Sequence, residues 1–257
     1  MSDEREGLLR AAKQLIETDE LLGGSFTPAV SNPLPACEVS EGAPPSPSAG
    51  RAEPSAELDP ADKAAALKEL DEREVRKCTR CALCEARTRT VFGEGDPNAD
   101  LVFVGEGPGQ EEDRQGRPFV GRAGELLTKM IVAMGLSRER VFICNMVKCR
   151  PPGNRTPSPD EVQACWGYLV RQLQIIRPKV IVTMGNPATQ NLLDTRTGIT
   201  RLRGQWQELP DIGEDLAGTP VMPTFHPAYL LRQYTKDNRQ RVWSDLQAVM
   251  EKIGLKT

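Results

Sequence analysis

Four short apolar runs, each followed by a loop and a segment of helical character, constrain the fold of this chain more than any other feature. The runs are residues 101–104, 141–147, 180–184 and 221–225. The first of them, LVFV, is continuously apolar, as is typical of a strand buried on both faces. Helical patterns follow at 123–135, 158–176, 187–193 and 238–253. Alternating strands and helices predict an α/β fold with three layers (α/β/α) and a central, mainly parallel four-stranded sheet.

The helix that follows the second run carries a clear start signal. Ser158, Pro159 and Glu161 have the residue types of an N-cap, the first helical position and the third, which together make a capping box. The helix is predicted to end near Ile176. In sheets of this kind ligands bind at the carboxyl ends of the strands, so the loops after the four runs are the predicted functional site.

The first 61 residues differ in composition from the rest. Within residues 1–22, apolar side chains recur at helical spacing and predict a short amphipathic helix. Residues 23–61 are rich in Gly, Ser, Pro and Ala, bury too little apolar area to offset their ordering entropy, and predict a disordered linker. Residues 62–257 are then the folded domain. The N-terminal helix is either a docking peptide for a protein partner or an arm without one.

Composition narrows the class of protein and its surroundings. The chain has 257 residues and seven cysteines, its start is acidic and polar, and it contains no run of eighteen apolar residues. We therefore expect a cytoplasmic protein with reduced thiols and no membrane span. Its net charge of −3 combines −9 in residues 1–75 with +6 in residues 76–257. A basic body is compatible with a polyanionic partner.

Four cysteines have the spacing of ligands for one metal centre. Cys78 and Cys81 form a C-x-x-C pair. Cys149 follows 68 residues later, and Cys165 another 16 residues later. Four thiolates suit either tetrahedral zinc or an iron–sulfur cluster. Cys84 extends the first pair to C-x-x-C-x-x-C and is a rival ligand.

The loop after the first run, residues 105–119, is rich in glycine and in acidic residues. Glycines let backbone N–H groups approach a ligand closely. The loop fits neither the dinucleotide-binding pattern nor the Walker pattern, and its acidic residues would repel phosphates. A neutral or electron-poor ligand fits better. Phe119 either stacks on a planar ring or belongs to the core, and the residue alone favours the core.

Two polar residues mark the other strand ends. Asn145 lies inside the second apolar run, where an amide costs free energy unless it finds a partner. Its adjacent donor and acceptor match the edge of a nucleobase, although a bond to neighbouring backbone would also satisfy it. His226, the only histidine, directly follows the fourth run and is either structural or catalytic. Residues 229–231 are either core or an apolar wedge for DNA.

These motifs together resemble uracil-DNA glycosylase family 4, the iron–sulfur branch. The resemblance covers roughly residues 76–252 and includes the cysteine spacing, LVFVGEGPG at 101–109, GRPFVGRAG at 116–124, NMVKCRPP at 145–152 and HPAYLL at 226–231. Residues before 70 lie outside the family's common core.

The resemblance implies a structural 4Fe–4S cluster on four thiolates: Cys78, Cys81, Cys149 and Cys165. It implies a pocket for a flipped uracil lined by Gly105, Gly107, Pro108, Gly109, Phe119, Asn145 and His226. DNA contacts are expected from Arg150, Arg155, Arg203, Leu230 and Arg232, with Leu230 filling the gap that the flipped base leaves. The segment 203–205, which begins with Arg203, is also typical of a surface turn.

Roles in the reaction follow from the same resemblance. Phe119 stacks on the base, and the Asn145 amide reads its edge. Glu106 lines the base and its sugar, and Glu112 crowds C5 and excludes the methyl group of thymine. His226 donates to the uracil O2 as negative charge develops there.

The resemblance also predicts the type of hydrolysis. Another branch has an aspartate at the position of Gly107 to position water, so this chain is expected to react by a largely dissociative route without a strong general base from that loop. A further branch traps the sugar covalently through a second histidine, which this chain lacks. We expect a monomer that acts on uracil in single- or double-stranded DNA. The alternatives are a non-catalytic or covalent-trapping uracil-DNA binder, and an iron–sulfur redox protein.

Overall fold

The computed structural model describes residues 59–213 and 216–255. The predicted amphipathic helix and most of the predicted linker lie outside the described residues. Helix α2 begins at Pro60, two residues before the predicted start of the domain at residue 62, because Pro60 occupies the first helical position behind Asp59.

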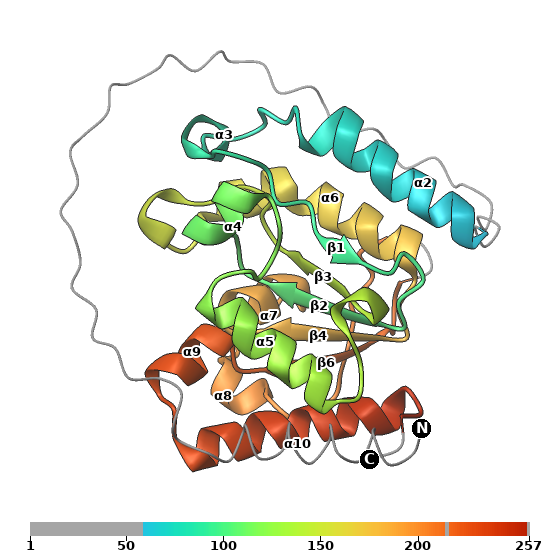
Figure 1. The fold of residues 1–257 in the computed structure, drawn as a ribbon, viewed down its shortest axis with the longest axis vertical. Helices are drawn as coiled ribbons and strands as arrows, with labels where there is room; N and C mark the ends of the chain where they lie inside the picture. Colours follow the sequence, from blue (N-terminus) through green and yellow to red (C-terminus); the bar gives the residue numbers. More distant parts are fainter. Residues whose placement is uncertain (1–58, 214–215, 256–257) are drawn as a thin grey trace.

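A six-stranded sheet in the order β1-β3-β2-β4-β6-β5 forms the centre of the fold (Figure 1). Its strands are β1 (Glu94–Gly95), β2 (Leu101–Gly105), β3 (Phe142–Asn145), β4 (Val180–Met184), β5 (Gln207–Glu208) and β6 (Pro220–Thr224). The four inner strands are mutually parallel, and β1 and β5 pair antiparallel at the edges. The α/β class is confirmed. The count of four strands is wrong because the edge strands have two residues each, too few for an apolar run.

Twelve helical segments connect and cover these strands in the described part of the chain. They are α2 (Pro60–Leu70), the π-helix η1 (Asp71–Val75), α3 (Leu83–Ala86), α4 (Gln110–Gln115), α5 (Arg122–Ala133), the 3-10 helices η2 (Arg138–Arg140) and η3 (Pro152–Asn154), α6 (Pro159–Ile176), α7 (Asn186–Leu192), α8 (Ile199–Leu202), α9 (Pro227–Arg232) and α10 (Lys236–Lys252). The capping box of α6 is present: the Glu161 backbone N–H donates to Ser158 Oγ over 3.3 Å, and the Ser158 N–H donates to the Glu161 carboxylate over 2.8 Å.

Two apolar clusters, one on each face of the sheet, make the three layers. Helices α2 and α6 contribute residues such as Leu67 and Leu169 to one cluster. Helices α5 and α10 contribute residues such as Leu127 and Leu246 to the other. Figure 1 shows these helix pairs on opposite sides of the strands. The predicted three-layer arrangement is therefore confirmed.

The parallel strands bring their carboxyl ends to one edge of the sheet. In the register of β2 and β3, Gly105 pairs with Asn145. The pairing continues past the strands, because the Met146 N–H donates to the Gly105 carbonyl over 2.9 Å and the Val147 N–H to the Glu106 carbonyl over 3.2 Å. The glycine-rich loop and the segment after Asn145 are therefore held side by side.

Candidate active site and metal centre

A pocket of about 790 Å³ opens at the carboxyl ends of the four parallel strands. Its lining includes all seven residues expected to bind the base except Gly105, together with Glu106 and Glu112. Gly105 lies directly behind the pocket wall, against Asn145 and Phe119. The volume is in the range of small-molecule sites and exceeds what a single base requires.

The side-chain amide of Asn145 is buried without hydrogen-bond partners among the described residues. The residue is 1 % exposed, and neither its side-chain nitrogen nor its side-chain oxygen has a hydrogen-bond partner in the described part of the chain. Leaving a buried amide unpaired costs about 1–3 kcal/mol for each group. An amide that lines a pocket and is left open in this way is available to a ligand that presents one acceptor and one donor.

Gly105 lets the amide and an aromatic ring pack directly on the backbone. A Cβ atom at Gly105 would lie 2.4 Å from Asn145 Oδ1 and 2.6 Å from the Phe119 ring. Both distances are below van der Waals contact, so any larger residue would displace the amide or the ring. The glycine is therefore required by close approach rather than by its dihedral angles.

Phe119 is held in a strained conformation beside this amide. It is 6 % exposed, and its φ of 51° lies in the left-handed region that aromatic residues rarely adopt. Arg138 Nη1 donates to the Phe119 carbonyl over 3.0 Å, and Arg138 also pairs with Glu94. A Cβ atom at Gly124 would lie 1.9 Å from the same carbonyl. Such strain persists only where the surroundings enforce it, and here it presents the ring to the pocket.

Glu112 supports the same segment from the pocket side. One carboxylate oxygen accepts hydrogen bonds from the Val120 and Gly121 N–H groups, both over 2.9 Å. The other oxygen lies so close to Gly109 that a Cβ there would be 2.7 Å away. The carboxylate thus joins the glycine-rich loop to the loop that carries Phe119.

His226 is the N-cap of α9 and lines the pocket. The Ala228 N–H donates to His226 Nδ1 over 3.0 Å, so Nδ1 is the acceptor and the proton of the neutral ring lies on Nε2. Burial, with a contribution from the Arg232 charge, lowers the pKa of His226 to about 4. The ring is neutral at pH 7 and retains one N–H donor. Its centroid lies 5.6 Å from that of Phe119.

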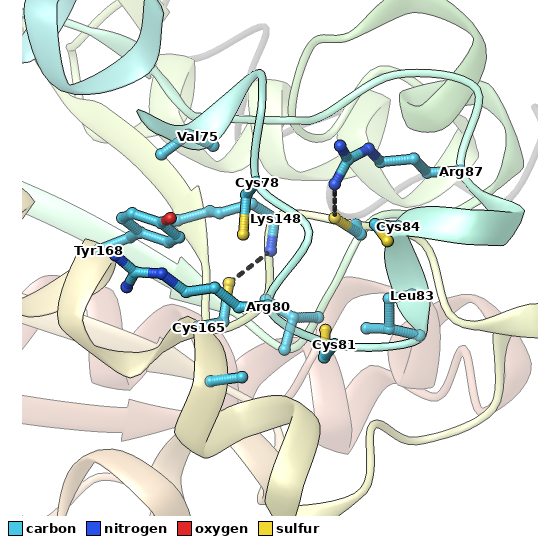
Figure 2. Close-up of a pocket in the computed structure, with 13 residues that line it drawn as sticks. Val75, Cys78, Arg80, Cys81, Leu83, Cys84, Arg87, Lys148, Cys165 and Tyr168 are labelled. Carbon is cyan, nitrogen blue, oxygen red and sulfur yellow. Dashed lines mark hydrogen bonds between the residues drawn. The ribbon is translucent and has the colours of Figure 1, made fainter. Parts of the chain in front are cut away.

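A second, small cavity lies between the loop before α3 and the start of α6. Five cysteines line it: Cys78, Cys81, Cys84, Cys149 and Cys165. Figure 2 shows the labelled sulfur atoms surrounding one shared space. Arg87 Nη1 donates to Cys149 Sγ over 3.1 Å, and the Lys148 backbone N–H donates to Cys165 Sγ over 3.3 Å. Hydrogen bonds of this kind stabilise thiolates that bind metal.

The protonation of these thiols depends on what they bind. Burial raises the pKa of the Cys149 thiol to about 11 and also raises the pKa of Cys165 and Cys81. At these three positions a nearby positive charge therefore favours the thiolate form. Among the described residues, no three His, Cys, Asp or Glu side chains lie close enough to share a single metal ion.

Comparisons with known proteins identify the family. The family model of the uracil DNA glycosylase superfamily matches residues 92–247. The chain belongs to the uracil-DNA glycosylase superfamily. A type-4 uracil-DNA glycosylase from Thermotoga maritima is 48% identical over 185 residues, which are 70% of this chain and 92% of the relative. One from Archaeoglobus fulgidus is 44% identical over 196 residues, 74% of this chain and 96% of the relative.

These relatives place this superfamily member in the type-4 branch. A type-5 uracil-DNA glycosylase from Pyrobaculum aerophilum is less similar, at 32% identity over 157 residues, 55% of this chain and 67% of the relative. The superfamily match begins at residue 92, so the C-x-x-C pair lies outside the matched segment. Among the described residues, no helix is long and apolar enough to cross a membrane.

The five residues expected to contact DNA have different environments. Arg232 lines the pocket and is exposed. Arg155 also lines it but forms a two-bond pair with Glu161 over 2.6 and 2.8 Å. Arg150 does not line the pocket itself but precedes Pro151, which does. Its Nε donates to Asn154 Oδ1 over 2.7 Å.

The other two expected contacts are committed to the protein interior. Arg203 pairs with the buried carboxylate of Asp245 and also donates to the Arg241 carbonyl over 2.7 Å. Leu230 is 3 % exposed and packs in the apolar cluster beneath α9, while the next residue, Leu231, is half-buried. Leu230 would have to leave the core to enter a duplex.

Several residues at the site were not found from the sequence. Arg122 is an exposed arginine that lines the pocket at the start of α5. Arg138 and Glu94 hold the Phe119 segment from distant positions. No local pattern marks the roles of Arg138 and Glu94, since these depend on the fold. Arg122 lies within the motif GRPFVGRAG, which is the only sequence signal for it.

Proposed function

We propose that this superfamily member is a uracil-DNA glycosylase of base excision repair, which receives a flipped uracil nucleotide and hydrolyses its N-glycosidic bond to leave an abasic site. The observation that carries the proposal is the unpaired amide of Asn145 in the pocket wall. Uracil presents an acceptor at O4 beside a donor at N3–H. The amide N–H can donate to O4, and its carbonyl oxygen can accept from N3–H.

Recognition of the base then combines stacking with exclusion. The Phe119 ring offers a flat apolar face next to the amide, and stacking on an aromatic ring stabilises a flipped base. Glu112 is fixed by two backbone N–H groups, which supports its role as a rigid wall against the methyl group at C5 of thymine. Glu106 lines the same pocket beside the base and its sugar.

Bond cleavage requires stabilisation of the departing anion. As the bond between C1′ and N1 breaks, its electron pair moves to uracil and negative charge collects on O2. His226, neutral with its proton on Nε2, can donate to that oxygen. Removing one donor of this kind from an enzyme typically lowers the rate about 10²–10³-fold.

Completion of the reaction needs a water molecule but no strong base from the glycine-rich loop. Water adds to C1′ of the electron-deficient sugar and loses a proton, and the abasic strand and uracil are released. Gly107 has no side chain with which to position that water. A Cβ atom at this position would lie only 2.9 Å from Val147 Cγ2. This supports a largely dissociative route.

One assay separates this function from its alternatives. The protein is incubated with an oligonucleotide that contains one uracil, in single- and double-stranded form, and the strand is then treated with alkali. Cleavage at the uracil position, together with release of free uracil, is the expected result. Retarded migration without cleavage would instead indicate a non-catalytic binder, and an SDS-stable complex would indicate covalent trapping. A protein that only transfers electrons would neither bind nor cleave.

We further propose that the cysteine cavity holds a 4Fe–4S cluster through Cys78, Cys81, Cys149 and Cys165. Five cysteines line this one cavity, and cysteine thiolates are the ligands that hold such clusters. The donor chemistry therefore supports the cluster. When bound, it supplies a structural link between the loop before α3 and the start of α6.

Cysteine substitutions test the cluster and its fourth ligand. Cys149→Ala is expected to abolish visible absorption at about 400 nm and to lower the melting temperature, because the cluster loses a buried ligand. Cys84→Ala is expected to retain the absorption and the iron content. Iron and sulfide analysis of both variants is the measurement. Loss of the band in Cys84→Ala with retention in Cys149→Ala would reverse the ligand assignment.

Phosphate contacts are proposed for the arginines at the pocket mouth. Arg122 and Arg232 both line the pocket, are exposed, and have no ion-pair partner among the described residues. Arg155 is held by Glu161, and Arg203 by Asp245, so each would have to share its carboxylate to contact DNA. The two unpaired guanidinium groups are the better phosphate ligands.

Salt dependence checks this assignment. In Arg122→Gln the KM for DNA is expected to rise, while the slope of log KM against log salt becomes smaller by about 0.7–0.9, which corresponds to one lost phosphate contact. The kcat value is expected to stay unchanged. Arg140→Gln is the matched control, since Arg140 is also exposed but precedes β3, at the amino end of that strand. Equal slopes for both variants would contradict the contact.

A further inference from the structure

Lys148 is almost completely buried between the two sites. It is 1 % exposed, although lysine is among the residues least often buried, and it lines the cysteine cavity. Its backbone N–H donates to Cys165 Sγ over 3.3 Å. Its side chain turns back along the chain, and Nζ donates to the Asn145 carbonyl over 2.7 Å.

The second hydrogen bond of Lys148 Nζ anchors the side chain to the helix layer. Lys148 Nζ donates to Gln172 Oε1 over 2.6 Å, and Gln172 Nε2 donates to the Phe92 carbonyl over 2.9 Å. Gln172 belongs to α6 and is fully buried. The strand end that carries Asn145 is therefore tied through Lys148 to α6 and to the segment before β1.

The position of Asn145 depends on such backbone contacts because its side chain has no hydrogen bond of its own to any described residue. Both polar atoms of its amide are unpaired within the described residues, so no hydrogen bond of the amide fixes its direction. Its orientation depends on the backbone, which is held by the pairing with Gly105 on one side and by Lys148 on the other. A displacement of about 1 Å at a reacting group can lower a rate about 100-fold.

We propose that Lys148 is a positioning residue for catalysis: it fixes the Asn145 amide against the base and links that amide to the cysteine cavity. This rests on the proposed glycosylase function. It assigns the lysine a role through Asn145, since Lys148 does not line the base pocket. The removal of its side chain should therefore slow bond cleavage without removing any group that touches the substrate.

The test is a double-mutant cycle on the full-length, cluster-loaded protein. Lys148→Met keeps the length and apolar stem of the side chain but removes its donors. In the otherwise unchanged protein we expect kcat on uracil-containing DNA to fall about 10–100-fold with little change in KM, and the affinity for free uracil, measured by calorimetry, to fall in parallel. In the Asn145→Ala background the same substitution is expected to have no further effect on either quantity.

A matched control separates positioning from general stability. Lys63 is the other buried lysine of the described residues, and its Nζ donates to the Ile176 carbonyl over 3.0 Å, far from the pocket. Lys63→Met is expected to lower the melting temperature and leave kcat unchanged. Absorbance of the cluster per protein chain is measured for every variant, and Lys148→Met is expected to match the unsubstituted protein.

Different outcomes separate the failure of each proposal. An unsubstituted protein without glycosylase activity overturns the proposed function, whereas full activity of Lys148→Met overturns the positioning role alone. An equal loss of rate with and without Asn145, or a loss that follows cluster content, also overturns it. If Lys148→Met does not fold, Gln172→Met is used instead, because it removes one of the two acceptors of Lys148 Nζ. We then expect a smaller loss of kcat, which disappears in the Asn145→Ala background.

Discussion

Asn145→Ala is expected to lower the glycosylase rate about 10²–10³-fold without lowering the stability of the protein. The loss of rate follows from the removal of the amide that pairs with the base and stabilises it as negative charge develops. Stability is preserved because the amide is 1 % exposed and both of its polar atoms are unpaired. The removal of an unpaired buried group relieves a cost of about 1–3 kcal/mol, which offsets the lost packing. Single-turnover kinetics and thermal unfolding measure the two effects.

A buried polar residue with satisfied hydrogen bonds provides the contrast. Thr183 is fully buried in strand β4, and its hydroxyl lies 2.8 Å from that of Thr189. Thr183→Ala is expected to destabilise the fold by about 1 kcal/mol, since it leaves the Thr189 hydroxyl with one partner fewer. If Asn145→Ala destabilises the protein by as much as Thr183→Ala, the amide has a structural role and is not reserved for a ligand.

The inner strands and the long helices could be predicted because each has a local signal. Strand β4 has the predicted bounds, since Val180–Met184 is a mainly apolar run between Lys179 and Gly185. Helix α6 begins where its capping box predicts. The candidate pocket followed from one rule, that parallel strands bring their carboxyl ends to one edge. The residues at those ends line one pocket for this reason.

The remaining features depend on contacts between distant segments. Edge strands of two residues exist only because β3 and β6 offer them a partner. The strained φ of Phe119 is enforced by Arg138, nineteen residues away. The pairing of Arg203 with Asp245 spans 42 residues, and no sequence pattern reveals it. Leu230 was expected to contact DNA from its position after His226, and its burial follows from the face of α9 that packs on the sheet.

His226→Asn is expected to lower the rate about 10²–10³-fold while α9 keeps its cap. Asparagine is a good N-cap residue and can accept from the Ala228 N–H as Nδ1 does, but it is too short to place a donor where Nε2 lies. In the unsubstituted protein the rate should not change with the ionisation of His226 between pH 5.5 and 8, because its pKa of about 4 leaves the ring neutral throughout. A rate that falls as pH rises through about 6.5 would show that the charged ring is required.

The same variant tests the protonation state through stability. In the folded protein the pKa of His226 is lowered from 6.5 to about 4 by burial, so between these values the unfolded chain binds a proton that the folded chain does not. Stability is therefore lost as pH falls from about 6.5 towards 4, by about 2 kcal/mol at pH 5 for this group alone. His226→Asn lacks this contribution, and its free energy of unfolding should fall less between pH 7 and pH 5 than that of the unsubstituted protein. Parallel pH profiles for the two proteins would mean that the folded-state pKa of His226 is close to 6.5 and that its ring is positively charged below that pH.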